Sequence, residues 1–272
     1  MPVLTKITVQ KKNQSRYNLF IDGSYAFAVD EDVLIKYHLV KGKELSELDI
    51  VKIRHEDQVR KAYNAAIQFL SFRMRSASEI QSYLQRKDWD PSIIKVVIGE
   101  LEKQQYINDL EFAKAFVRTY ANSGKKGPLV LKQELQKKGV SGEHIIHAVK
   151  EYPEEKQIED AIRLGNKYAE QNQKLSERML KQKLEYMLAT KGFPPHIVQS
   201  AMEAVDYEKG EEFEWETLCK EAEKAKRRYK KYTGYEYKQR IQQALYRKGF
   251  TSHLIKRYIG QDEPGGSTEN GK

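Results

Sequence analysis

The sequence predicts a mostly α-helical protein, an elongated stack of tandem three-helix repeats preceded by a small N-terminal β-meander. Three observations support this class: a phrase that recurs four times, helical periodicity from about Ser46 nearly to the end, and a β-prone start of some thirty residues. Of the 272 residues, 39% are hydrophobic and 32% are charged. This composition leaves enough apolar material for a core but makes a large surface, which favours an elongated protein over a compact enzyme with one core.

The first thirty residues contain three β-prone runs, "ITVQ", "RYNLFI" and "YAFAV", in which apolar residues alternate along one face. Asp22-Gly23 lies between the second and third runs, and this pair is favoured where both turn residues need a positive φ. Since three strands alone are barely stable, we expect the meander to pack on a neighbouring helix. The next segment, 30–42, predicts a short helix with Asp30 as its cap and Gly42 as its stop.

A long helical segment follows from about Ser46 to Phe72, and its charged middle, "RHEDQVRK", is expected to be exposed or bent. The end of this segment, 63–72, serves as the first helix of the first repeat. The equivalent helices of the other repeats are predicted at 108–121, 158–170 and 214–229.

The repeated phrase has a leucine as its reference position, and the four copies are Leu84, Leu135, Leu188 and Leu245. Four residues after the leucine, three copies have a glycine that directly follows a lysine, at Gly139, Gly192 and Gly249. The first copy has Asp88 at this position. Glycine at this point permits the left-handed conformation that closes a helix, and the next residue is apolar in every copy. N-cap residue types follow in three copies. Each phrase therefore predicts a helix, a capped turn and the start of the next helix.

These patterns divide the chain into six parts. They are a β-rich extension (1–45), a first repeat with a long lead-in helix (46–106), a second repeat (107–152), a third (153–206), a fourth (207–260) and a disordered tail (261–272).

Several classes of protein are disfavoured. No run of 18 apolar residues exists, the N-terminus lacks a signal-peptide pattern, and the single cysteine, Cys219, allows no internal disulfide. We expect a cytoplasmic protein that is monomeric and does not bind membranes.

Catalysis and metal binding are also disfavoured. His144 and His147 share a helix face, but no cysteine or third ligand accompanies them. The segment "GKKGP" lacks the context of a phosphate-binding loop, and no G-x-S-x-G sequence occurs. We expect no catalytic residue, no metal and no cofactor.

The charge balance is more informative. Lys and Arg outnumber Asp and Glu by 48 to 39, which favours an anionic partner, although a basic surface without such a partner remains an alternative. The segment "KAKRRYKKY" (224–232) suits a phosphate backbone, or else forms a solvated helix face balanced by the acidic residues 208–216. A lysine also stands just before the turn between the two helices of each repeated phrase, where the four lysines either form a row that follows a regular partner or merely favour the helix C-terminus. These lysines are Lys87, Lys138, Lys191 and Lys248.

Three segments give the chain a resemblance to the RecX family of bacterial RecA modulators: "SASEIQSYLQRK", "LEKQQYINDLEFAKAFV" and "GPLVLKQELQKKGV". The resemblance covers roughly 60–260, and the β-rich start resembles the extension of longer members. Asp88 departs from the usual glycine, which affects only local geometry. The most family-specific residues, mostly structural, are Tyr106, Asn108, Asp109, Phe112 and Ala113.

The resemblance implies a non-enzymatic regulator in DNA repair, homologous recombination and the SOS response. It implies that the protein binds RecA and the groove of the RecA filament on single-stranded DNA, where it inhibits ATP hydrolysis, strand exchange and cleavage of the SOS repressor. Weak direct binding to DNA is a further expectation. The candidate residues facing RecA or DNA are Lys87, Lys125, Lys126, Lys138, Arg227, Arg228, Lys230, Lys231 and Lys248. Two alternatives remain open: an autonomous, sequence-independent DNA-binding protein, and a helical adaptor for another protein.

Overall fold

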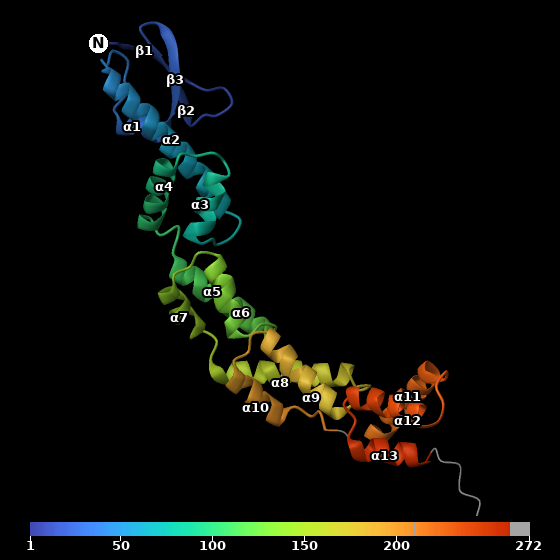
Figure 1. Ribbon diagram of the computed structural model, residues 1–272. Helices are drawn as coiled ribbons and strands as arrows, with labels where there is room; N and C mark the ends of the chain where they lie inside the picture. The colour runs from blue at the N-terminus through green and yellow to red at the C-terminus, as the bar shows by residue number, and fades with distance from the viewer. Residues whose placement is uncertain (209, 262–272) are drawn as a thin grey trace, which may run out of the picture. The chain divides into compact units, whose positions relative to one another are not determined.

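The computed structural model describes residues 1–208 and 210–261 (Figure 1). Within this range the chain is mostly helical, with one small antiparallel sheet at its start, so the predicted fold class is confirmed. The described chain divides into two compact units, Met1–Phe116 with Glu134–Ala148, and Val117–Gln133 with the chain from Val149 onward. The predicted tail lies outside the described residues except for Gln261.

The N-terminal sheet has the order β1-β2-β3, formed by β1 (Leu4–Val9), β2 (Arg16–Ile21) and β3 (Ser24–Asp30). The turn between β2 and β3 has φ 50° at Asp22 and φ 83° at Gly23, which confirms the predicted tight turn. Leu19 and Val29 are buried on the inner face, where they pack with residues of the two following helices. The sheet is thus stabilised by a helix-covered face, as three strands require.

The first two helices are α1 (Glu31–Lys36) and α2 (Glu47–Leu70). The side chain of Asp30 caps α1, as predicted, but the helix ends at Lys36, and His38 follows with φ 45°, so the predicted stop at Gly42 was wrong. The charged middle of α2 continues as helix, and its Asp57 is buried. That carboxylate accepts hydrogen bonds from the Arg16 side chain and pairs with Lys61. These contacts within the fold compensate for the burial of the negative charge.

In the first unit, the second half of α2 packs with α3 (Ala77–Gln85) and α4 (Pro91–Lys103) around a common core that contains Leu84, Ile94 and Leu101. The helices of the second repeat are α5 (Asp109–Ser123), α6 (Pro128–Lys137) and α7 (Gly142–Val149). Their residues contribute to both units.

In the second unit, two further three-helix groups have cores of their own. The first contains α8 (Glu154–Gln171), α9 (Glu177–Thr190) and α10 (Pro195–Ala204); the second contains α11 (Glu211–Tyr229), α12 (Gly234–Arg247) and α13 (Ser252–Gln261). Both α8 and α11 begin earlier than predicted because their first turns are rich in acidic residues, which favour a helix N-terminus but show no apolar periodicity.

The repeated turn has the same geometry in all four copies. The N–H of the apolar residue after the turn donates to the carbonyl of the reference leucine, at 3.3 Å, 3.1 Å, 3.2 Å and 3.3 Å in chain order. The residue before it has a positive φ, 76° at Gly139, 88° at Gly192 and Gly249, and 59° at Asp88. This arrangement is the helix-ending motif expected from the sequence, and it confirms the fourfold repetition.

Candidate partner-binding surface

Each lysine–glycine turn contacts the start of the middle helix of the preceding repeat. In the first unit, Ser76 Oγ donates to the Lys138 carbonyl at 2.6 Å; in the second unit, Ser176 Oγ donates to the Lys248 carbonyl at 2.5 Å. A Cβ added at Gly139 would lie 2.3 Å from the Ser78 Cβ. Glycine is therefore required twice over, by its backbone conformation and by the close approach.

The joint between the second and third repeats uses backbone groups instead of a serine. The N–H of Gly127 donates to the Lys191 carbonyl at 2.7 Å, and the N–H of Leu129 donates to the Gly192 carbonyl at 3.0 Å. A Cβ at Gly192 would lie 2.6 Å from the backbone nitrogen of Val130. In all three joints, therefore, the lysine–glycine turn of one repeat packs against the start of the middle helix of the preceding repeat.

A carboxylate from the next repeat completes two of these joints. Asp109 Oδ1 accepts from the N–H of Ala77 at 2.8 Å, and the Glu214 carboxylate accepts from the N–H of Glu177 at 3.2 Å. Both N–H groups belong to the first turn of a middle helix, where donors lack partners within the helix. Asp109 is one of the family-specific residues, and its role here is structural.

The other family-specific residues are mainly structural as well. Asn108 Oδ1 accepts from the N–H of Glu111 and so caps α5. Phe112 and Ala113 are buried, whereas Tyr106 is 57% exposed. Four of the five signature residues are therefore held in fold contacts, whereas Tyr106 is exposed.

Two of the predicted row lysines form ion pairs at the joints. Lys138 Nζ lies 2.9 Å from the Glu79 carboxylate, and Lys248 Nζ lies 2.8 Å from that of Glu221. Burial would raise the pKa of Glu79, but hydrogen bonds from Arg73, Lys138 and the Ser76 N–H outweigh it and lower that pKa to about 2. These lysines already have partners inside the protein.

Three further candidate lysines are exposed. Lys87, Lys125 and Lys191 are exposed, and no described acidic side chain lies within ion-pair distance of them. Lys126 lies over the ring of Tyr120, 4.2 Å from its centroid.

The C-terminal end of α11 carries the densest positive charge. Arg227, Arg228, Lys230 and Lys231 are all exposed there. The rings of Tyr229 and Tyr232 lie 6.3 Å apart, and the Arg240 guanidinium lies 3.8 Å from the centroid of Tyr232. We call these four cations and two tyrosines the α11 basic cluster.

The acidic residues upstream do not neutralise this cluster. Glu211 and Glu212 lie in the first turn of α11. Sixteen residues of helix separate Glu212 from Arg228, which is roughly 24 Å and exceeds the Debye length of about 8 Å at physiological salt. Glu221 and Glu223 pair instead with Lys224 and Lys226. The first acidic turn of α11 is therefore too distant to pair with the cluster, and a solvated helix face remains the alternative to a binding surface.

A buried polar network secures the start of the third repeat. The Tyr152 hydroxyl donates to Asp160 at 2.9 Å, and Arg163 pairs with the same carboxylate at 2.8 Å. Burial, then the hydrogen bond to Asp160, raises the pKa of Tyr152. Arg163 also donates to the Gly124 carbonyl, so this network is structural rather than catalytic in form.

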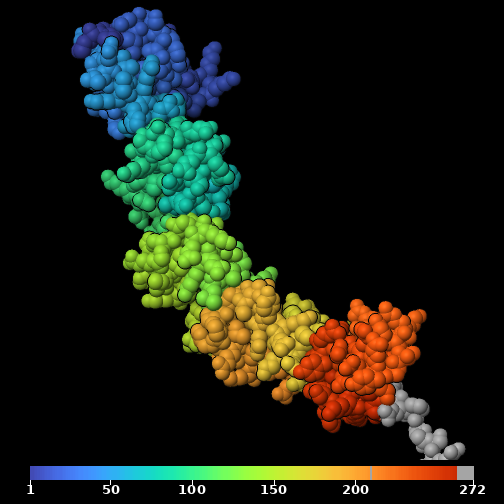
Figure 2. Space-filling view, in the orientation of Figure 1, coloured from blue at the N-terminus to red at the C-terminus, as the bar shows by residue number. Residues whose placement is uncertain are grey.

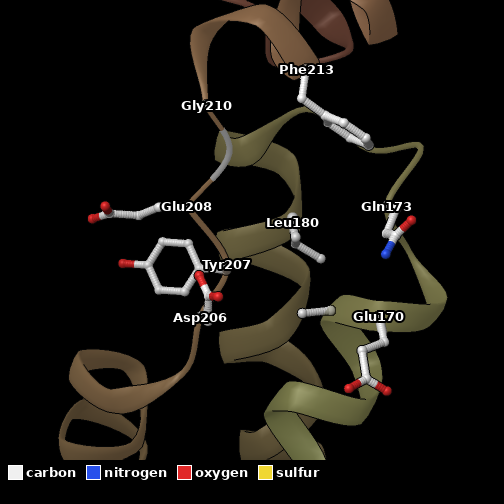
Figure 3. Close-up of a pocket in the computed structure, with 9 residues that line it drawn as sticks. Glu170, Gln173, Leu180, Asp206, Tyr207, Glu208, Gly210 and Phe213 are labelled. Atoms are coloured by element: carbon white, nitrogen blue, oxygen red, sulfur yellow. The ribbon is translucent and has the colours of Figure 1, made fainter.

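Two of the concave regions in the second unit lie along helices of the third repeat. One, of about 370 Å³, lies beside α8 and α9; Glu170, Asp206, Glu208 and Tyr207 line it (Figure 3). The other, of about 730 Å³, is a groove along α9 and α10 beside Tyr186. In the described range, no three His, Cys, Asp or Glu residues are grouped so as to hold a metal ion, and no helix is long and apolar enough to cross a membrane.

Comparison with family models assigns every part of the repeat structure. The model of the regulatory protein RecX N-terminal domain matches residues 2–46, and those of the first and second RecX three-helix domains match 62–101 and 108–149. The model of the third RecX three-helix domain matches twice, at 154–202 and 211–259. The chain belongs to the RecX family. Its fourth repeat is therefore a second copy of the third RecX domain type.

Curated RecX relatives match along nearly their whole length. The regulatory protein RecX of Bacillus subtilis strain 168 is 42% identical over 263 residues, which cover 97% of this chain and all of the relative. The RecX of Bacillus licheniformis is 42% identical over 265 residues, with the same coverage.

Two solved RecX structures have the same fold. The crystal structure of a regulatory protein RecX matches with a TM-score of 0.69 and 35% identity, covering 75% of this chain and 100% of the other. The RecX structure from Lactobacillus salivarius matches with a TM-score of 0.53 and 32% identity, covering 56% of this chain and 98% of the other.

Proposed function

We propose that this RecX-family protein binds the RecA recombinase and its filament on single-stranded DNA. Bound in the filament groove, it inhibits ATP hydrolysis, strand exchange and RecA-dependent cleavage of the SOS repressor. The observation that carries the proposal is the full-length match to RecX regulatory proteins, in which the N-terminal domain and all four repeats are accounted for.

The repeat architecture suits a partner that is itself periodic. Each repeat offers its own outer surface, and several weak contacts in series gain from effective concentration without one deep pocket. The α11 basic cluster and Lys87, Lys125 and Lys191 supply exposed cations that pair with no acidic side chain among residues 1–208 and 210–261. We expect these groups, more than Lys138 and Lys248, to face the filament.

The first test measures RecA's ATP hydrolysis on single-stranded DNA, with this protein added well below the RecA concentration. Inhibition that persists when the DNA is raised to a large excess supports direct action on the filament. Hydrolysis that stays unchanged, or recovers with added DNA, contradicts the proposal; recovery would instead favour a plain DNA-binding protein.

A charge-reversal variant tests the α11 basic cluster. Changing Arg227, Arg228, Lys230 and Lys231 to glutamate should raise the concentration for half-inhibition about tenfold or more, because electrostatic contacts both steer and hold the complex. A matched control changes the exposed Lys41, Lys95, Lys150 and Lys167 to glutamate, with the same change in net charge. Circular dichroism verifies that helicity is retained. Equal effects of both variants would remove the cluster from the binding surface.

A further inference from the structure

The N-terminal sheet has an outer face that no helix of its core covers. Lys6 of β1 lies opposite Phe20 of β2, and Phe20 lies opposite Tyr25 of β3, so the three residues form one cross-strand row. The next row on this face contains Thr8 and Asn18. The core of the sheet lies on the other side, among Leu19, Val29 and their neighbours.

Two aromatic rings stand on this outer face. Phe20 and Tyr25 have centroids 5.9 Å apart with an interplanar angle of 76°, and neither belongs to the buried core. Tyr25 is 60% exposed, so its ring is accessible to a ligand. Lys6 Nζ lies 5.5 Å from the centroid of Phe20.

Lys6 is the cation beside these rings, and Lys11 and Lys12 lie toward the other end of β1. Lys6, Lys11 and Lys12 are exposed, and the six-residue connection between β1 and β2 that carries Lys11 and Lys12 stands out from the N-terminal body in dark blue (Figure 2). Between Met1 and Val29 the sequence contains one acidic residue, Asp22, whose carboxylate accepts from the N–H of Val3. Arg16 is a fourth cation, but it is held inward by Asp57.

We propose that this sheet face binds single-stranded nucleic acid. Exposed bases stack on Tyr25 and Phe20, while Lys6 contacts the adjacent phosphates. Four residues of extended strand separate Lys6 from Gln10, roughly 13 Å, so Lys11 and Lys12 reach phosphates further along the same strand. The uncharged Thr8 and Asn18 between these positions offer hydrogen bonds to base edges.

Single strands fit this surface better than a duplex does. A sheet face that carries an exposed ring can receive unstacked bases, as aromatic platforms on sheets do, whereas the bases of a duplex are already stacked on one another. A partner protein with an acidic patch would use the lysines but not the flat faces of both rings. This proposal concerns a site distinct from the RecA-directed surface, and its test contains no RecA.

The test uses the full chain and fluorescein-labelled dT20, with anisotropy as the readout. Tyr25→Ala should weaken the affinity for dT20 about fivefold or more, because one base loses its stacking partner. Tyr25→Phe should keep the affinity within about twofold of wild type. Tyr186→Ala is the matched control, because Tyr186 is an exposed tyrosine of the second unit. Repeating the titration with U20 distinguishes a DNA site from an RNA site.

Cross-linking locates the bound oligonucleotide directly, whereas affinity also depends on basic residues elsewhere in the chain. An oligonucleotide that carries 5-iodouracil should cross-link to the peptide containing Tyr25 or Phe20, as identified by mass spectrometry. Changing Lys6, Lys11 and Lys12 to glutamine should reduce the slope of log K against log salt by about 2. If Tyr25→Ala behaves like Tyr186→Ala and all cross-links lie elsewhere, the proposal is overturned and a protein becomes the better candidate for this face.

Discussion

At the scale of single residues, the departure of Asp88 from the glycine of the other copies has a structural reason. All four positions have positive φ, but only Gly139, Gly192 and Gly249 lie against the start of a preceding middle helix. The first three-helix repeat has no such repeat before it. An aspartate tolerates the left-handed conformation better than most residues, so it is acceptable where no close approach occurs.

Gly139→Ala should therefore destabilise the first unit by about 2–4 kcal/mol, because it adds both backbone strain and an overlap with Ser78. Asp88→Gly is the matched comparison. It should leave stability unchanged or raise it by up to about 1 kcal/mol. Urea unfolding followed by circular dichroism measures both. An alanine at 139 that costs nothing would contradict the docking account.

Glu79 should make stability depend on pH. The pKa of Glu79 in the folded protein, about 2, is below the ordinary value of 4.5. The contribution of this carboxylate to the free energy of unfolding is therefore fully present above pH 4.5 and is lost as the pH falls toward 2. Allowing for solvent screening at this partly exposed site, the contribution is about 1–2 kcal/mol. The stability difference between wild type and Glu79→Gln should shrink over that window. The exposed Glu102→Gln serves as control; a difference for Glu79→Gln that is constant with pH would refute this role.

At the scale of elements, α3 and α9 begin in the same way, although they lie about a hundred residues apart in sequence. Ser76 and Ser176 each cap their own helix and also donate to the carbonyl of a turn in the following repeat. A carboxylate from that same repeat accepts from the next N–H. The helix start thus satisfies its free donors with groups from a neighbour, and this couples local capping to packing between repeats.

Ser176→Ala should cost about 2–3 kcal/mol, because the cap is lost and the Lys248 carbonyl is left without its partner. Ser46→Ala, which removes only the cap of α2, should cost about 1 kcal/mol. Hydrogen exchange distinguishes the two. Ser176→Ala should speed exchange in α11 and in the turn at Gly249, whereas Ser46→Ala should affect α2 alone. Unchanged exchange in α11 would argue against coupling through this serine.

At the scale of the whole molecule, stability should behave as a sum of neighbouring contacts, as in other repeat proteins. Gly139 and Gly249 belong to different compact units and share no partner. The destabilising effects of Gly139→Ala and Gly249→Ala should therefore add within about 0.5 kcal/mol, and each should speed hydrogen exchange in its own unit. If both units of the double variant unfold in one cooperative step, this independence is contradicted.

Much of this architecture could be predicted from local patterns. Asp22-Gly23 indicated its turn, and the lysine–glycine pairs indicated helix ends, because both depend on conformational preferences of the residues themselves. The docking of the turns could not be predicted in this way. The acceptors are main-chain carbonyls of Lys138 and Lys248, and a carbonyl has no sequence signature. Nor did the sequence indicate that these two lysines would pair with Glu79 and Glu221, since those partners lie in other helices.

Helix boundaries were predicted less well where charged residues stand in place of a periodic apolar pattern. The start of α11 consists of glutamates, and α1 stops before its expected glycine because His38 adopts the left-handed conformation. The α11 basic cluster was recognised from its composition, whereas the outer face of the N-terminal sheet became evident only when the register placed Lys6, Phe20 and Tyr25 in one row.

The docked turns also bear on self-association. Each joint is heterologous, since a turn of one repeat meets the helix start of another, and contacts of this kind can propagate from molecule to molecule without closing. The turn of the first three-helix repeat is the one that would dock onto a second copy of the chain. It carries Asp88, whose side chain would occupy the space that Gly139, Gly192 and Gly249 leave empty. We therefore expect Asp88 to disfavour docking of this turn onto a second copy of the chain.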